Sequence, residues 1–217
     1  SINSITGPQV WQGENMSGRS DWVYRLPTDT LDELQSIVKS VSARGVTAKG
    51  FNFETIDIPD LRVALMPIVN ALGEGSGVAL IKDMNIQNYT IDELKMALLL
   101  IGHHIGFVGP QEGINKWIGE VRDVNPVDRS HYYHGGGPLP MHMDPVDVAG
   151  LLCIRDAKLG GTSHIVSSSQ VHNEILNERP DLLEILYRGY RQRRREHRRN
   201  GSPPLTEFHC PVFAEVG

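Results

Sequence analysis

The sequence predicts an α+β fold in one domain, residues 1–217, with helices first and short strands after them. Two observations support this prediction. Apolar residues recur at helical spacing in the N-terminal part, about 1–110, whereas short apolar or alternating runs recur between turn residues from about 115 onward. No internal repeat divides the chain, which is why one domain is expected.

Two helices are expected first. Thr30 and Glu33 form a capping-box pattern, after which apolar residues fall on one helical face as far as Gly45. A second helix is expected after Asp60, and Pro67 should kink or shorten it because proline lacks the backbone N–H.

A strand and a third helix follow a glycine-rich break. Val78–Ile81 is a short apolar run typical of a buried strand. Thr90 and Glu93 form another capping box, and the apolar spacing after them predicts a helix that ends at Gly102. The N-terminal part is therefore expected to pack helices around one strand.

The second half predicts an antiparallel sandwich or barrel, because turn residues and not long helices separate its strand-like runs. These runs are Trp117–Val124, Val146–Ile154 and Thr162–Val166. A helical insert over residues 171–186 follows them. Residues 188–217 are again strand-like, and Pro211–Phe213 is interpreted as a strand that awaits its partner.

Composition is that of an ordinary globular protein and excludes several partners. The net charge of −5 gives no overall attraction to nucleic acid or to an anionic membrane, and no apolar run is long enough to span a bilayer. The two cysteines, Cys153 and Cys210, form no disulfide framework, so a reducing cytoplasm is the expected compartment.

One local feature departs from this charge balance. Seven arginines crowd between Arg188 and Arg199. A nucleic-acid patch is one interpretation, but few aromatic residues interleave with them, so a solvated face or an anion-binding rim near the site is favoured. No nucleic-acid partner and no membrane partner are expected.

The candidate site is His142-Met143-Asp144. Alternate side chains of a strand share a face, so His142 and Asp144 on an extended segment can place an imidazole nitrogen and a carboxylate oxygen on one metal ion. Iron(II) oxygenases use two histidines and one carboxylate on one side of the metal. A bare His-x-Asp pattern is unspecific, because a surface pair or a turn gives the same sequence.

The surrounding pattern is more specific than the pair itself. Segments that match one family occur in the same order along nearly the whole chain: Gly7–Trp11, Gly75–Ile81, Trp117–Val124, Leu139–Asp144, Asp147–Cys153, Gly160–Ser168 and Pro211–Phe213. This ordered set resembles the taurine dioxygenase-like (TauD/TfdA) family of iron(II)- and 2-oxoglutarate-dependent oxygenases.

The resemblance implies a double-stranded β-helix (jelly-roll) core that starts at about 115–217, with flanking N-terminal helices and a helical insert. It implies Fe(II), 2-oxoglutarate and O2 as cofactor and cosubstrates, with His142 and Asp144 as two metal ligands. Ser163, with Thr162 as the neighbouring candidate, would bind 2-oxoglutarate through a hydroxyl donor. The alternative for both residues is ordinary strand sequence after a Gly-Gly turn.

The reaction that the resemblance implies is oxidation of an unactivated C–H bond of a small organic substrate, by hydroxylation, desaturation or ring formation, with release of succinate and CO2. A non-catalytic or truncated metal-binding jelly-roll protein is the alternative function. A hydrolytic zinc site is the alternative enzyme class. The expected partner is a small molecule, with a homo-oligomer as an open alternative to a monomer.

The family's third metal ligand, a histidine, and its 2-oxoglutarate-binding arginine are expected beyond Gly217. The C-terminal part of the family fold is therefore expected to be missing, and the chain to be a portion of a longer polypeptide. His209 is a less favoured third ligand within the chain, because no arginine follows it.

Further candidates would line the substrate pocket. His131, Tyr133 and His134 lie in the loop before the His-x-Asp pattern. His104 follows a helix, and its alternative role is that of a packed residue at a helix C-terminus.

Overall fold

The computed structural model describes residues 2–111, 116–122, 138–144, 146–193 and 203–214. The chain divides into two compact units, each assembled from separate stretches of sequence. The core unit comprises residues 23–72 and 79–161. The terminal unit comprises residues 1–22, 73–78 and 162–217.

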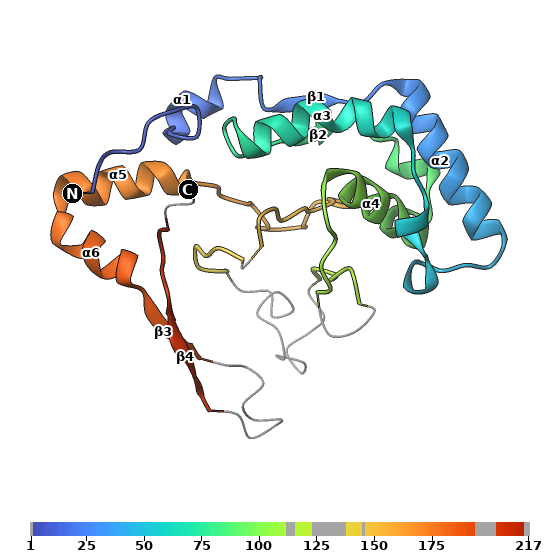
Figure 1. Cartoon of the computed structure of the whole chain (residues 1–217). Coiled ribbons are helices and arrows are strands. Elements are labelled where there is room, and N and C mark those ends of the chain that lie inside the picture. The colour runs from blue at the N-terminus through green and yellow to red at the C-terminus, as the bar shows by residue number, and fades with distance from the viewer. Residues whose placement is uncertain (1, 112–115, 123–137, 145, 194–202, 215–217) are drawn as a thin grey trace. The chain divides into compact units, whose positions relative to one another are not determined.

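The core unit is a set of helices beside a small parallel sheet (Figure 1). Strands β1 and β2 pair in parallel, with Val23 opposite Leu80 and Arg25 opposite Lys82. The elements in order are β1 (Val23–Arg25), α2 (Thr28–Ala43), α3 (Pro59–Gly73), β2 (Leu80–Lys82) and α4 (Ile91–Ile105). Short 3₁₀ turns lie between them at Ala48–Gly50, Phe53–Thr55 and Ile86–Asn88.

Apolar side chains at helical spacing form the core of this unit. The fully buried members come from α2, α3 and α4 and are Leu34, Val38, Leu61, Leu65, Ile68, Met96 and Leu100. Residues three or four positions apart share one helical face, so each helix presents one apolar stripe to its neighbours. Burial of each such side chain stabilises the fold by about 1.5–3 kcal/mol.

The two capping-box predictions had different outcomes. At α4 the prediction is confirmed, because the Thr90 side chain accepts from the Glu93 N–H and the Glu93 carboxylate accepts from the Thr90 N–H. At α2 it is wrong: the helix begins at Thr28, so Thr30 lies inside it and is buried. The four-residue pattern alone did not distinguish a first-turn position from a cap.

Pro67 also behaves differently from the prediction. The helix that contains it, α3, continues to Gly73. Pro67 is exposed, while Leu65 and Ile68 on either side of it are fully buried. A backbone carbonyl that loses its helical partner at an exposed position can bond to water, which allows the helix to continue.

The described part of the terminal unit contains three helices and a β-hairpin. Its elements are α1 (Gly13–Ser17), α5 (Ser168–Glu178), α6 (Pro180–Arg188), β3 (Tyr190–Arg193) and β4 (Leu205–Cys210). Pro180 occupies the first turn of α6, where its missing N–H costs nothing. Strands β3 and β4 are antiparallel, with Tyr190 opposite Cys210, and their register shifts between Arg191 and Arg193. The predicted helical insert and the strand-like character after Arg188 are thus confirmed.

Three of the predicted strands are absent from the described residues. Residues 116–122, 146–154 and 162–166 contain no strand. A strand requires a hydrogen-bonded neighbour as well as an alternating pattern, and none of these runs has a ladder partner within the part of the chain that the structure describes. The structure is therefore a mixture of helices and small sheets, and the jelly-roll core stays a prediction.

The segment Pro211–Phe213, predicted as a strand, packs against the helices of the terminal unit instead. The Val212 N–H donates to the Leu186 carbonyl at 2.8 Å. The ring centroid of Phe213 lies 5.2 Å from that of His172. Bonding and packing to α5 and α6 replace the sheet neighbour that the sequence led us to expect.

Candidate active site

His142 has one ring nitrogen held by the backbone and one without a partner. Its Nδ1 lies 2.8 Å from the Pro140 carbonyl oxygen. Because a carbonyl oxygen only accepts, Nδ1 carries the hydrogen, and in the neutral ring Nε2 then bears the lone pair. Among the described residues no group is hydrogen-bonded to Nε2.

Asp144 lies two residues further on, and its carboxylate also lacks a hydrogen-bond partner in the described part of the chain. Its backbone carbonyl accepts from the Val146 N–H at 2.8 Å. Both His142 and Asp144 are exposed. Residues 138–144 form no strand, so the alternation of faces that motivated the pair does not apply to these residues as described.

The side chains of His142 and Asp144 offer two of the three donor atoms that a protein site for iron(II) of this kind requires. A neutral imidazole nitrogen and a carboxylate oxygen are the donor types of the two-histidine, one-carboxylate site. The Nδ1 bond to a backbone carbonyl is the arrangement that fixes a metal-binding histidine in its ligating tautomer. Within the described ranges no group of three or more His, Cys, Asp or Glu side chains could hold a metal ion together. The assignment of His142 and Asp144 as ligands therefore stays a prediction.

Thr162 and Ser163 follow a tight Gly-Gly turn. Gly160 and Gly161 have φ values of 73° and 76°, which L side chains rarely adopt, and a Cβ at Gly161 would lie 2.7 Å from the Cβ of Ala157. Thr162 and Ser163 are both exposed. Their hydroxyls have no hydrogen-bond partner among the described residues, so both are available to a ligand.

His104 is a buried residue with both ring nitrogens bonded to backbone. Its Nδ1 donates to the Leu100 carbonyl at 2.7 Å, and its Nε2 accepts from the Ile58 N–H at 2.9 Å. The side chain is 0% exposed. These contacts support the alternative role of a packed residue at the end of α4. The other pocket candidates, His131, Tyr133 and His134, lie outside the described residues.

The segment that begins at Trp117 contacts other parts of the core unit through an aromatic pair and an ion pair. Trp117 lies edge-on to Phe53, with ring centroids 5.5 Å apart. The Glu120 carboxylate pairs with Lys95 of α4 and with Arg122. The hydrogen bond from Lys95 is the main cause of the lowered pKa of Glu120. The sequence indicated a strand here but gave no signal for the ion pair, which joins residues 25 positions apart.

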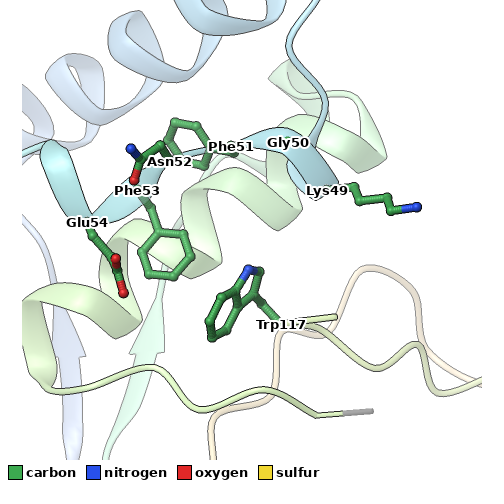
Figure 2. A pocket seen from close by; sticks show the side chains of 7 residues that line it. All are labelled: Lys49, Gly50, Phe51, Asn52, Phe53, Glu54 and Trp117. Atoms are coloured by element: carbon green, nitrogen blue, oxygen red, sulfur yellow. The ribbon is translucent and has the colours of Figure 1, made fainter. Parts of the chain in front are cut away.

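A small open pocket of about 240 Å³ lies beside Trp117. Its lining comes from residues 49–54 and Trp117. Figure 2 shows the rings of Phe53 and Trp117 next to each other, with the amino group of Lys49 pointing away from them. None of the sequence-predicted site residues lines it.

In the terminal unit the structure reveals polar contacts that the sequence did not predict. The Asn173 side chain bonds to both the N–H and the carbonyl of Ile5, and the Ser167 hydroxyl donates to the Gln9 carbonyl. Both contacts join residues more than 150 positions apart. The only signal in the sequence was that Gly7–Trp11 and Gly160–Ser168 both belong to the family-like set of segments.

No helix among the described residues is long and apolar enough to cross a membrane.

Comparison with known proteins identifies a family that matches most of the chain. The family described as "Taurine catabolism dioxygenase TauD, TfdA family" matches residues 42–214. That range includes His142, Asp144, Thr162 and Ser163. It also spans parts of both compact units.

Two curated proteins are similar over most of the chain. "FR-33289 synthase" of Streptomyces rubellomurinus is 26% identical over 204 residues, which cover 92% of this chain and 60% of that protein. "Taurine hydroxylase-like protein SAT17" of Stachybotrys chartarum is 22% identical over 195 residues, which cover 84% of this chain and 50% of that protein. The chain thus spans about half to three fifths of the length of these relatives.

Proposed function

The chain belongs to the TauD, TfdA family of taurine catabolism dioxygenases, and from this premise we propose that it acts as an iron(II)- and 2-oxoglutarate-dependent dioxygenase. Its substrate would be a small organic molecule with an unactivated C–H bond, and its products would include succinate and CO2. The jelly-roll core that surrounds such a site in the family is part of the same proposal. The family resemblance seen in the sequence is confirmed by the match to residues 42–214.

The observation that carries the proposal is the state of the His142 ring. Nδ1 donates to the Pro140 carbonyl, which leaves the lone pair on Nε2, the atom that would bind iron(II). A histidine in a surface turn needs no such fixed tautomer. Asp144 would add a carboxylate oxygen, and a histidine outside the described residues would complete the ligand set.

Thr162 and Ser163 would hold the cosubstrate. 2-Oxoglutarate carries two negative charges, so its carboxylates require donors, and a hydroxyl can donate to one of their oxygens. The Gly160–Gly161 turn before them has no side chain that could obstruct a ligand. When bound, iron(II) and 2-oxoglutarate supply the oxidising chemistry, while the chain's residues bind and orient them.

The names of the two relatives support a small-molecule substrate. One is called a synthase of FR-33289, and the other is called taurine hydroxylase-like. Taurine is a small organic molecule, and a synthase is named for the compound that it makes. At 26% and 22% identity the relatives support the class of substrate and leave its identity to a screen.

The proposal is tested by succinate release from 2-oxoglutarate. We expect the full-length protein with iron(II), ascorbate and O2 to release succinate, slowly alone and faster with a matching substrate. His142→Ala should abolish release because it removes the Nε2 donor. Leu139→Ala, which changes an exposed neighbour whose side chain has no donor atom, is the matched control and should leave release unchanged. Equal rates for wild type and His142→Ala would overturn the proposal.

A further inference from the structure

The N-terminal residues are fastened to α5 by a two-way hydrogen-bonded contact. The Asn173 Nδ2 donates to the Ile5 carbonyl at 2.8 Å, and the Asn173 Oδ1 accepts from the Ile5 N–H at 2.8 Å. One side-chain amide thus satisfies both polar groups of one backbone residue, as a neighbouring strand would. Asparagine provides both a donor and an acceptor in this geometry, which aspartate and alanine do not.

A second contact fixes the beginning of the same helix. Ser167 is the N-cap of α5: its hydroxyl oxygen accepts from the Gln170 N–H at 3.0 Å. The same hydroxyl donates to the Gln9 carbonyl at 2.5 Å, and Ser167 is only 5% exposed. The first turn of α5 is therefore joined to residues 5–9 by a buried hydroxyl that makes both of its bonds.

The side-chain amide of Asn173 also accepts a hydrogen bond from a buried histidine, His172. The His172 Nδ1 lies 3.2 Å from the Asn173 Oδ1, and its Nε2 lies 3.1 Å from the Tyr187 hydroxyl. Because Oδ1 only accepts, Nδ1 carries the hydrogen, and Tyr187 donates to Nε2. His172 is 0% exposed. The direction of the Asn173 amide is thus set by a chain of bonds that begins on α6.

These contacts lie just after the residues assigned to the cosubstrate. Among the described residues, none of Thr162 to Val166 makes a hydrogen bond, so Ser167 is the first bonded residue after Ser163. Four residues of extended chain span at most about 14 Å. The position of Ser163 therefore depends on how firmly the start of α5 is held.

We propose that Asn173 and Ser167 are positioning residues that clamp residues 5–9 onto α5 and thereby fix the segment that carries Thr162 and Ser163. The cosubstrate part of this inference rests on the proposed function. Loss of the clamp should free the start of α5 and leave residues 162–166 attached to a mobile end. In the intact protein, residues 5–9 would thus influence the position of Thr162 and Ser163 without contacting the cosubstrate themselves.

Hydrogen exchange of the full-length protein tests the clamp without turnover. Asn173→Ala should speed exchange of the amides of Ile5, Gln170 and Val171, which are hydrogen-bonded in and beside the clamp. The effect should be about 5- to 150-fold, because the two side-chain-to-backbone bonds that are lost contribute about 0.5–1.5 kcal/mol each. Asn177→Ala is the matched control, since Asn177 lies exposed on the same helix without a hydrogen bond among the described residues. Unchanged exchange at Gln170 and Val171 in Asn173→Ala would overturn the proposal, because the start of α5 would then be held without Asn173.

Kinetics provide the second readout. In Asn173→Ala and Ser167→Ala we expect the KM for 2-oxoglutarate to rise about tenfold while kcat changes less, because the cosubstrate donors are misplaced and the metal ligands are not. Asn173→Asp, which keeps the acceptor but loses the donor to Ile5, covers the case in which Asn173→Ala does not fold. An unchanged KM in all three variants would also overturn the proposal. A wild type without 2-oxoglutarate turnover, but with the expected exchange pattern, would refute only the proposed function.

Discussion

At the scale of single residues, a buried polar side chain can stabilise the fold when both its donor and its acceptor are hydrogen-bonded. His104 is the clearest case, since its ring donates to Leu100 and accepts from Ile58 in a neutral tautomer fixed by those two partners. A buried donor left without its acceptor costs about 1–3 kcal/mol. The bonds of His104 thus contribute to the stability of the core unit. The same reasoning about tautomers leaves the lone pair of His142 on Nε2, the atom that we propose as a ligand of iron(II).

We predict that His104→Leu destabilises the protein by about 2–3 kcal/mol, because the Ile58 N–H is left buried without an acceptor. His103→Leu should cost much less, since His103 is half-buried and makes ring contacts but no hydrogen bond in the described residues. Urea unfolding monitored by circular dichroism measures both. Equal losses in the two variants would contradict the structural role of His104.

At the scale of elements, α4 depends on the charge at its beginning. The backbone N–H of Thr90 donates to the Glu93 carboxylate, and this bond is the main cause of the lowered pKa of Glu93. Lys39 lies 3.5 Å away and favours the charged form further. The carboxylate also stands in the first turn, where a negative charge is favoured by the helix dipole.

The lowered pKa of Glu93 predicts a pH dependence of stability. A carboxyl whose pKa falls on folding stabilises the native state fully above its ordinary pKa of 4.5, and this contribution is lost as pH falls through the folded pKa. Glu93→Gln keeps the capping acceptor but removes the charge. We expect Glu93→Gln to be less stable than wild type at pH 7 and the gap to shrink well below pH 4.5. A gap that is constant with pH in urea unfolding would contradict the assignment.

The helices were predictable from the sequence because their determinants are local. The α4 capping box and the apolar spacing of α2 and α3 lie within a few turns of the chain. The exact start of α2 was not predictable, since Thr30 has the same four-residue pattern as Thr90. Strands depend on distant partners, and residues 116–122 lie in the core unit through Trp117 and Glu120 without any ladder.

At the scale of the whole molecule, the family was predictable from the sequence, whereas the long-range contacts were not. The match to residues 42–214 confirms the family that the ordered segments indicated. The contacts of Asn173 and Ser167 with residues 5–9 span most of the chain, so no local pattern could indicate them. Leu151 and Leu159 are 82% and 94% exposed, so these two apolar side chains of the second half are not covered by the described residues.

Iron(II) binding measured by anaerobic equilibrium dialysis tests the central claim most directly. The full-length protein should bind one iron(II) per chain, and more tightly with 2-oxoglutarate present. His142→Ala and Asp144→Ala should each lose this binding, whereas Leu139→Ala, an exposed neighbour whose side chain has no donor atom, should retain it. Stoichiometric iron in His142→Ala, equal to wild type, would contradict the account.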